Sequence, residues 1–107
     1  MAAWHDRYRL GTSVNLAVAS SGGTAASTAV FGAQTYGVRL AVLGTASSTA
    51  GVRYKFGNAA EAPAADTTSA LLPANWYEVV KITPGQRLSA IGNDGSTYTL
   101  NIVELSD

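Results

Sequence analysis

The stretch that decides the fold is Leu71–Leu105, LLPANWYEVVKITPGQRLSAIGNDGSTYTLNIVEL. Two turn signals divide it, Pro84-Gly85 and Asn93-Asp94-Gly95, and the segments around them alternate apolar and polar residues. Such alternation is typical of half-buried β-strands. The stretch therefore predicts three antiparallel strands joined by tight turns, with no room for a helix.

The upstream sequence continues this pattern. Val14, Leu16 and Val18 alternate with small or polar residues, and so do Val52, Tyr54 and Phe56. Pro63 and the Gly57-Asn58 pair oppose a long helix in the Ala-rich stretch over residues 57–70, which we expect to be a loop. We expect about seven strands, at residues 13–19, 24–32, 36–43, 52–56, 76–83, 87–92 and 97–105. Their spacing predicts an all-β fold, a single small antiparallel β-sandwich or a jelly-roll-like barrel.

Composition limits the classes of partner. The 107 residues suit one domain, and the absence of cysteine excludes disulfides and thiolate metal sites. Seven basic residues balance seven acidic ones, whereas nucleic-acid-binding proteins usually carry excess positive charge. We therefore expect no nucleic acid partner and no polybasic attachment to a membrane. The start of the chain also has charges where a signal peptide needs an apolar run.

The surface is expected to carry unusually little charge. Charged residues make up 13% of the chain, against about 25% in typical globular domains. An uncharged surface favours association, so a partner that covers part of it is one interpretation. A soluble monomer with an exterior rich in Ser and Thr is the other.

Residues 1–12 are expected to form an N-terminal arm, followed by a β-sandwich domain over residues 13–107. The arm contains Trp4, Arg7, Tyr8 and Arg9, and aromatic residues and arginine dominate the energetics of protein interfaces. These four residues are candidates for contact with a neighbouring subunit. The alternative is that Trp4 folds back onto the core of its own chain.

The residues reveal no catalytic or metal-binding constellation. His5 is the single histidine, and the sequence has no G-x-S-x-G nucleophile motif to accompany it. Asn93-Asp94-Gly95 lacks the further oxygen ligands of a calcium loop, and a hairpin turn explains it better. The acidic residues are scattered, and none of them is nominated as a glycosidase pair. We therefore predict no enzyme activity, no cofactor and no metal.

Two weaker surface signals remain. Arg39, Arg53 and Lys55 are expected on the solvent side of adjacent strands, where they form either a docking stripe for an acidic partner or an ordinary solvated face. Trp76 and Tyr77 begin a strand, and an exposed aromatic pair there would suit stacking on sugar rings. Strand alternation places the two on opposite faces, so at most one is expected to be exposed.

A series of short motifs follows the order of strands and turns over about residues 36–105. The motifs are Val38-Arg39-Leu40, Phe56-Gly57, Leu71-Leu72-Pro73-Ala74, Glu78, Pro84-Gly85 and Val103-Glu104-Leu105. This pattern resembles small structural proteins encoded by tailed bacteriophages. The resemblance includes no catalytic signature, and the N-terminal arm lies outside it.

This resemblance implies a virion component, most specifically a capsid decoration (cement) protein or a related head accessory protein. Such proteins are small β-sandwiches that assemble as homotrimers and bridge capsid subunits, so the implied partners are the major capsid protein or other virion proteins. The implied location is the virion, assembled in the cytoplasm of the bacterial host. The alternative is a carbohydrate-binding or receptor-binding β-module of a phage head fibre or tail.

Overall fold

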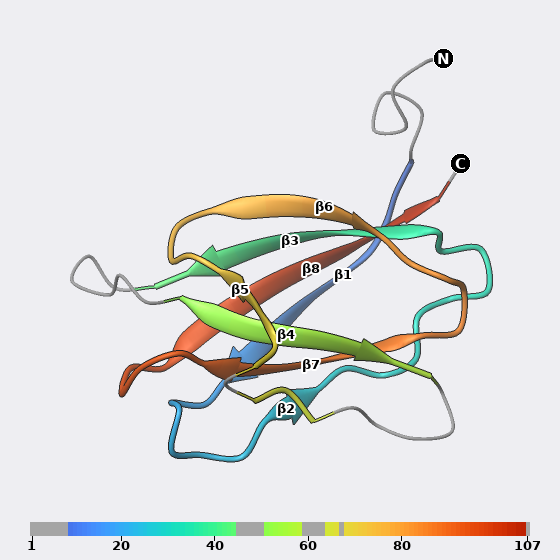
Figure 1. Ribbon diagram of the computed structural model, residues 1–107. Coiled ribbons are helices and arrows are strands. Elements are labelled where there is room, and N and C mark those ends of the chain that lie inside the picture. Colours follow the sequence, from blue (N-terminus) through green and yellow to red (C-terminus); the bar gives the residue numbers. More distant parts are fainter. Residues whose placement is uncertain (1–8, 45–50, 59–63, 67, 107) are drawn as a thin grey trace.

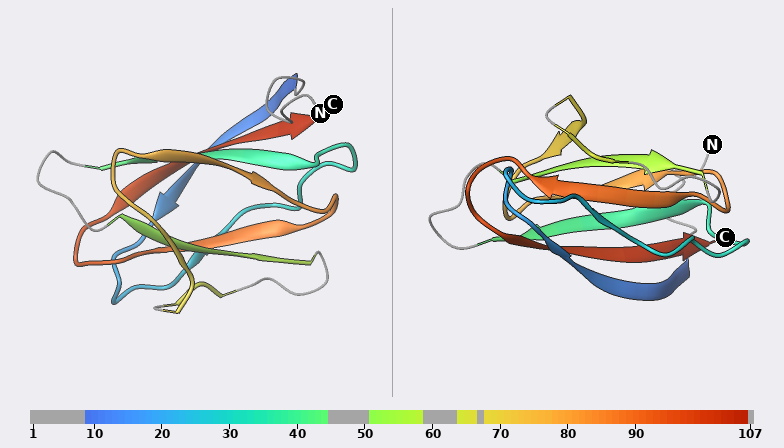
Figure 2. Two further views of the ribbon diagram at one scale, coloured as in Figure 1. Left: turned by 45° about the horizontal axis from the view of Figure 1, so that its top comes forward. Right: turned by 90° about the horizontal axis from the view of Figure 1, so that it is seen from below.

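The chain folds into two antiparallel four-stranded sheets that pack face to face (Figures 1 and 2). The computed structural model describes residues 9–44, 51–58, 64–66 and 68–106. The strands are β1 (Arg9–Val18), β2 (Ala26–Ser27), β3 (Gly37–Leu43), β4 (Val52–Gly57), β5 (Ala70–Leu72), β6 (Tyr77–Lys81), β7 (Arg87–Gly92) and β8 (Tyr98–Ser106). The predicted all-β sandwich is confirmed. Within these residues there is no helix that is long and apolar enough to cross a membrane.

Most strands that are consecutive in the sequence do not pair with each other, so the sheets are not built from a series of hairpins. Sheet I has the order β1-β8-β3-β6, and sheet II has the order β2-β7-β4-β5. Only β4 and β5 are both consecutive and paired, because every other connection between these strands passes from one sheet to the other. The turn at Asn93-Asp94-Gly95 therefore joins β7 of sheet II to β8 of sheet I, and the hairpin predicted there is wrong.

The expected strand boundaries need three corrections. The first strand begins at Arg9, so that residues 9–12, expected in the arm, belong to β1, and Arg9 and Leu10 pair with Ser106 and Leu105 at the end of β8. The strand expected at residues 24–32 is reduced to Ala26–Ser27. A short strand, Ala70–Leu72, follows the expected loop and pairs with β4. These three residues are too few for alternation to reveal a strand.

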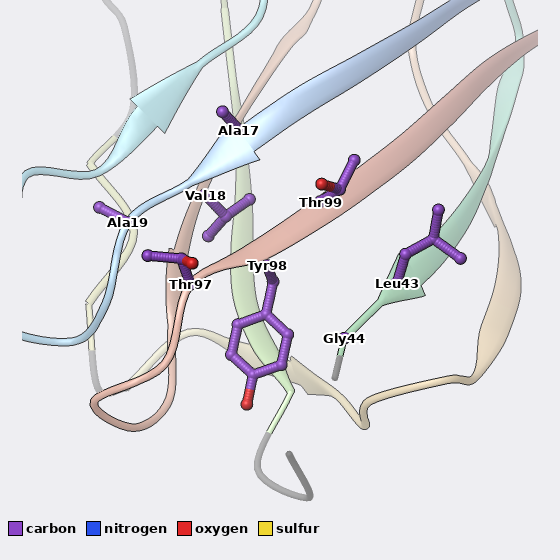
Figure 3. Close-up of a pocket in the computed structure, with 8 residues that line it drawn as sticks. All are labelled: Ala17, Val18, Ala19, Leu43, Gly44, Thr97, Tyr98 and Thr99. Atoms are coloured by element: carbon purple, nitrogen blue, oxygen red, sulfur yellow. The ribbon is translucent and has the colours of Figure 1, made fainter. Parts of the chain in front are cut away.

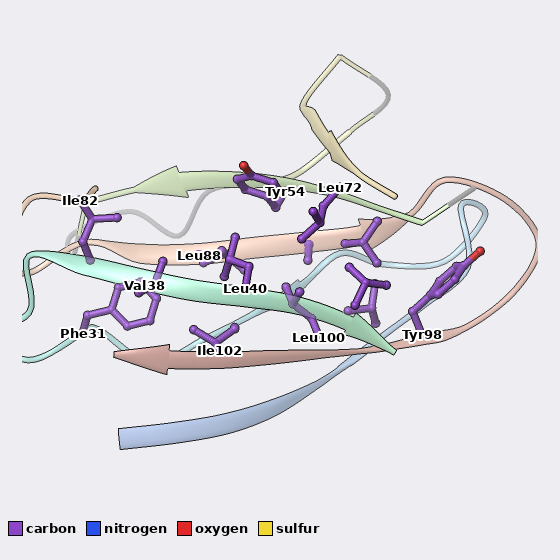
Figure 4. Close-up of a cluster of buried hydrophobic side chains, with 14 residues drawn as sticks. Phe31, Val38, Leu40, Tyr54, Leu72, Ile82, Leu88, Tyr98, Leu100 and Ile102 are labelled. Atoms are coloured by element: carbon purple, nitrogen blue, oxygen red, sulfur yellow. The ribbon is translucent and has the colours of Figure 1, made fainter. Parts of the chain in front are cut away.

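The core lies between the two sheets, and alternation determines which side chains enter it. Val38, Leu40 and Val42 of β3 are buried, and they face Leu88 and other apolar side chains of sheet II (Figure 4). The inward positions of β8 are likewise buried, as predicted, and the cluster also includes Val52 and Leu72. Full burial of a side chain of this size contributes about 1.5–3 kcal/mol, so this cluster is the main source of stability.

The turn at Pro84-Gly85 forms as the sequence predicts. Gly85 has a φ of 87°, and the amide of Gln86 donates to the carbonyl of Thr83 at 3.3 Å. Proline followed by a glycine with positive φ is typical of a type II turn. The turn carries the chain from β6 in sheet I to β7 in sheet II, so it closes one end of the sandwich.

Candidate functional site

The outer face of sheet II is partly covered by the chain itself. The amide of Ala65 donates to the Ser89 hydroxyl on β7 at 3.0 Å, and Ser89 is fully buried. Nη1 of Arg53 donates to the Ser69 carbonyl at 2.9 Å, which ties the end of the same segment to β4. The segment that leads into β5 therefore already occupies part of this face.

The outer face of sheet I carries exposed apolar side chains over β3 and β6. The register pairs Ala41 with Tyr77 and Arg39 with Val79, so their side chains lie on one face of the sheet. Leu43 is two residues beyond Ala41 and shares that face. Tyr77 is 65% exposed, Leu43 is 56% exposed and Val79 is 37% exposed. We call these five residues the β3–β6 patch.

The neighbouring half of this outer face, over β1 and β8, is uncharged and combines polar side chains with the apolar Val103 and Ala17. Nδ2 of Asn101 donates to the Ser13 hydroxyl at 3.2 Å and to Oδ1 of Asn15 at 2.8 Å. These bonds link β8 to β1 through side chains as well as through the backbone. Sheet I therefore presents the β3–β6 patch next to an uncharged surface that includes amides and hydroxyls.

A hollow of about 530 Å³ lies where β1, β8 and β3 reach the same end of the sheet (Figure 3). Ala17, Thr99 and Leu43 line it from three neighbouring strands, together with Thr97 and other residues. Tyr98 and Thr99 leave β8 on opposite sides (Figure 3). Leu43 belongs both to the hollow and to the β3–β6 patch, so the two features are continuous.

Trp76 and Tyr77 are both exposed, and the expectation that at most one would be is wrong. Trp76 is 63% exposed and directly precedes β6, which is an edge strand of sheet I. Asn75, with a φ of 59°, reverses the chain just before it, and asparagine tolerates this left-handed conformation better than most residues. In the described part of the chain, no further strand of sheet I lies beyond β6 to cover either aromatic side chain.

Three of the four residues proposed for the arm interface, Trp4, Arg7 and Tyr8, lie outside the described residues. The fourth, Arg9, is exposed at the start of β1 and pairs with Ser106. His5 also lies outside the described residues. The role proposed for the arm therefore stays a prediction.

The expected stripe of Arg39, Arg53 and Lys55 does not form. Arg39 is on β3 of sheet I, whereas Arg53 and Lys55 are on β4 of sheet II. Both sets point away from the core, so they lie on opposite outer faces of the sandwich. Arg53 is also occupied, because its Nε donates to Oδ1 of Asn93 at 2.9 Å in addition to its bond with the Ser69 carbonyl.

The polar side chains near the turns have structural partners. Oδ1 of Asp94 accepts bonds from the Ser96 amide at 3.0 Å and from the Tyr98 hydroxyl at 2.9 Å, which fixes the turn before β8. The Thr68 hydroxyl and amide hold the pKa of the exposed Asp66 carboxyl below its ordinary value. Among the residues that the structure describes, no group of three or more His, Cys, Asp or Glu side chains gathers as a metal site.

Sequence reasoning placed Arg39 on the correct side of β3 and named Tyr77 as part of an aromatic pair, but did not nominate Leu43 or Val79. Val79 and Val80 are adjacent in β6, so both sides of this strand carry apolar residues. One of those sides faces the solvent in an edge strand such as β6. Apolar residues at two consecutive positions were therefore the sequence signal for an exposed apolar surface. Comparisons with protein family models, curated proteins and solved structures found no match.

Proposed function

We propose that this chain is a non-enzymatic structural protein of a tailed bacteriophage virion, and most specifically a capsid decoration protein. The single observation that supports this proposal is the β3–β6 patch, an exposed apolar surface on a rigid sheet. Isolated exposed apolar residues are common on proteins, but contiguous ones mark interaction sites. The resemblance over residues 36–105 supplies the class of partner.

The proposed mechanism is mechanical, because the chain acts by attaching to the capsid and not by catalysis. Tyr77 and Leu43 bury apolar surface against the major capsid protein or another virion protein, and Arg39 supplies directional hydrogen bonds at the centre of the patch. An aromatic residue and an arginine are the residue types that dominate binding at protein interfaces. An interface of about 800 Å² per partner is sufficient for specific attachment.

Repetition on the shell strengthens this attachment. Each decoration protein that bridges neighbouring capsid subunits adds buried interface that must be broken before the shell opens. Linked contacts also raise the overall affinity without any new type of contact, because each one after the first forms at high effective concentration. The virion is the location of the assembled protein, and the cytoplasm of the bacterial host is where assembly takes place.

The test is whether the chain co-sediments with virus particles. Cultures that produce virions from the genome encoding this chain are lysed, the lysate is separated on a density gradient, and the chain is detected with an antibody. We expect the chain in the band of DNA-filled particles, and to remain there after the band is run a second time. A chain that stays with free proteins at the top of the gradient contradicts the proposal.

A carbohydrate-binding or receptor-binding module is the second candidate, and the joint exposure of Trp76 and Tyr77 favours it. Aromatic rings at an open edge offer stacking platforms, and the adjacent hollow adds the hydroxyl groups of Thr97 and Thr99. A glycan array with the wild-type protein and Trp76→Ala separates the candidates. Binding that is lost in the variant supports the module, whereas an array without signal supports the structural role.

A further inference from the structure

The four edge strands of the sandwich differ in how well they are protected against pairing with another chain. Edge strands are usually protected because they are short, carry charge or contain proline. β2 has two residues, and β5 has three and is followed by Pro73. β6 has five residues and carries Glu78 and Lys81. Each of these edges therefore has a recognised protective feature.

β1 lacks most of this protection. It has ten residues, and no charged residue follows Arg9 within it. It contains no proline, and its one irregularity lies between Leu10 and Ser13, so residues 13–18 are regular. Within the described part of the chain, β1 is hydrogen-bonded to β8 on one side and to no strand on the other. A long, regular and uncharged edge of this kind is a template for β-pairing.

The inner side of the same edge is incompletely covered. Val14 pairs with Ile102 and so points toward the core, yet it is 42% exposed. Val30, on the segment that follows β2, is 43% exposed. A notch of about 230 Å³ lies between β1 and this segment, with Val14, Val30 and Phe31 among its lining residues. The notch exists because β2 is too short to extend sheet II over the whole of β1.

We infer that β1 is the pairing edge for a second copy of this chain, joined antiparallel to the β1 of its partner about a two-fold axis. An occupant of this edge must supply apolar side chains on its inner side, toward the notch, and small polar side chains on its outer side. β1 itself has this pattern, because Val14 and Leu16 point inward whereas Ser13 and Asn15 point outward. The segment is therefore complementary to itself.

Electrostatics are compatible with the same occupant. Residues 10–18 carry no charge, so two copies of β1 meet without repulsion between like charges. The amides and hydroxyls of Ser13, Asn15 and Asn101 continue as a polar ladder across the two-fold axis. Because β1 and β6 are opposite edges of sheet I, the pairing leaves both β3–β6 patches free. This inference goes beyond the proposed function and does not depend on it.

Light scattering after size-exclusion chromatography, over a dilution series of the full chain, tests the pairing. We expect twice the mass of one chain for the wild type and a single-chain mass for Val14→Lys. Leu71→Lys is the matched control, since Leu71 is also 42% exposed but lies on the three-residue edge β5, and we expect it to remain a dimer. A wild-type monomer at every concentration, a trimer as the resemblance implies, or a dimeric Val14→Lys protein overturns the inference.

Hydrogen exchange on the wild type provides a second test that does not depend on a variant folding. We expect the amides of β1 to exchange several-fold more slowly at high protein concentration than at low concentration, and the amides of β5 to be unaffected by concentration. Exchange in β1 that is independent of concentration contradicts the inference. Light scattering and hydrogen exchange both use the isolated chain and need no virion. Their results therefore test the pairing of β1 even if the chain does not co-sediment with particles.

Discussion

The hydroxyl of Tyr54 on β4 donates a hydrogen bond to the carboxylate of Glu78 on β6, and so joins sheet II to sheet I. Tyr54 is almost completely buried, and its ring meets that of Phe56 edge to face, with the centroids 5.8 Å apart. Burial raises the pKa of Tyr54 well above its ordinary value, and the hydrogen bond and negative charge of Glu78 raise it further. The bond therefore requires the protonated tyrosine.

Stability is expected to fall in alkaline solution through Tyr54. The folded chain retains the tyrosine proton at a pH at which the unfolded chain has lost it, so this contribution is complete below a pH of about 10 and is lost as the pH rises beyond that value. Urea unfolding at pH 7 and at higher pH measures it. Tyr54→Phe should show a smaller decline in the free energy of unfolding above pH 10 than the wild type. Equal declines would show that Tyr54 does not carry the effect.

At neutral pH, Tyr54→Phe should lower the free energy of unfolding by about 1–3 kcal/mol, because the half-buried Glu78 loses its donor. Tyr77→Phe is the matched control, since Tyr77 is 65% exposed. We expect that control to stay within about 0.5 kcal/mol of the wild type. A neutral Tyr54→Phe variant would mean that solvent replaces the lost bond at no cost.

Gly51→Ala is expected to destabilise the fold by at least about 2 kcal/mol. Gly51 has a φ of +81°, and an added Cβ would lie 2.2 Å from the Leu72 carbonyl oxygen. Gly95→Ala is the control, because nothing lies within 4 Å of a Cβ there and we expect a change within about 0.5 kcal/mol. Thermal unfolding measures both variants. Similar midpoints for the two would show that the backbone at Gly51 adjusts easily.

The sequence was informative about local structure and uninformative about strand order. Tyr98, Leu100 and Ile102 are buried as their alternation predicted, because pleating acts between neighbouring residues. The Asn93-Asp94-Gly95 signal revealed a reversal of the chain but not the sheet to which the chain continues. That destination depends on pairing between strands that are distant in the sequence, which no local pattern encodes.

The same reason explains why the candidate site was recognised only in part. The exposure of Trp76 and Tyr77 follows from the position of β6 at the edge of sheet I, which is a property of the complete strand order. Arg39 and Arg53 have similar neighbours in sequence, with Val before each arginine and an apolar residue after it. The fold nevertheless places them on opposite faces of the sandwich. Only tertiary structure distinguishes an arginine in an open patch from one that holds a loop.

Arg53 is expected to be a structural residue. Arg53→Ala removes the bonds to Asn93 and to the Ser69 carbonyl, and should lower the free energy of unfolding by about 1–3 kcal/mol. Lys55→Ala is the control on the same strand and face, where the side chain is exposed, and a change within about 0.5 kcal/mol is expected. Urea unfolding measures both. Loss of attachment without loss of stability in Arg53→Ala would instead restore a docking role for this residue.

Substitutions in the β3–β6 patch are expected to weaken attachment to particles without unfolding the protein. Tyr77→Ser removes an exposed aromatic ring, and anchors of this type contribute enough to binding that we expect about a tenfold or greater loss of affinity. Leu43→Ser should act in the same direction. Both are measured by adding purified variants to particles that lack the chain and quantifying the bound fraction after sedimentation. Leu71→Ser removes a similar exposed apolar side chain from sheet II, so its binding should match the wild type. If all three variants bind equally well, the chain attaches through another surface; if all three lose binding together, the effect is general and the patch has no special role.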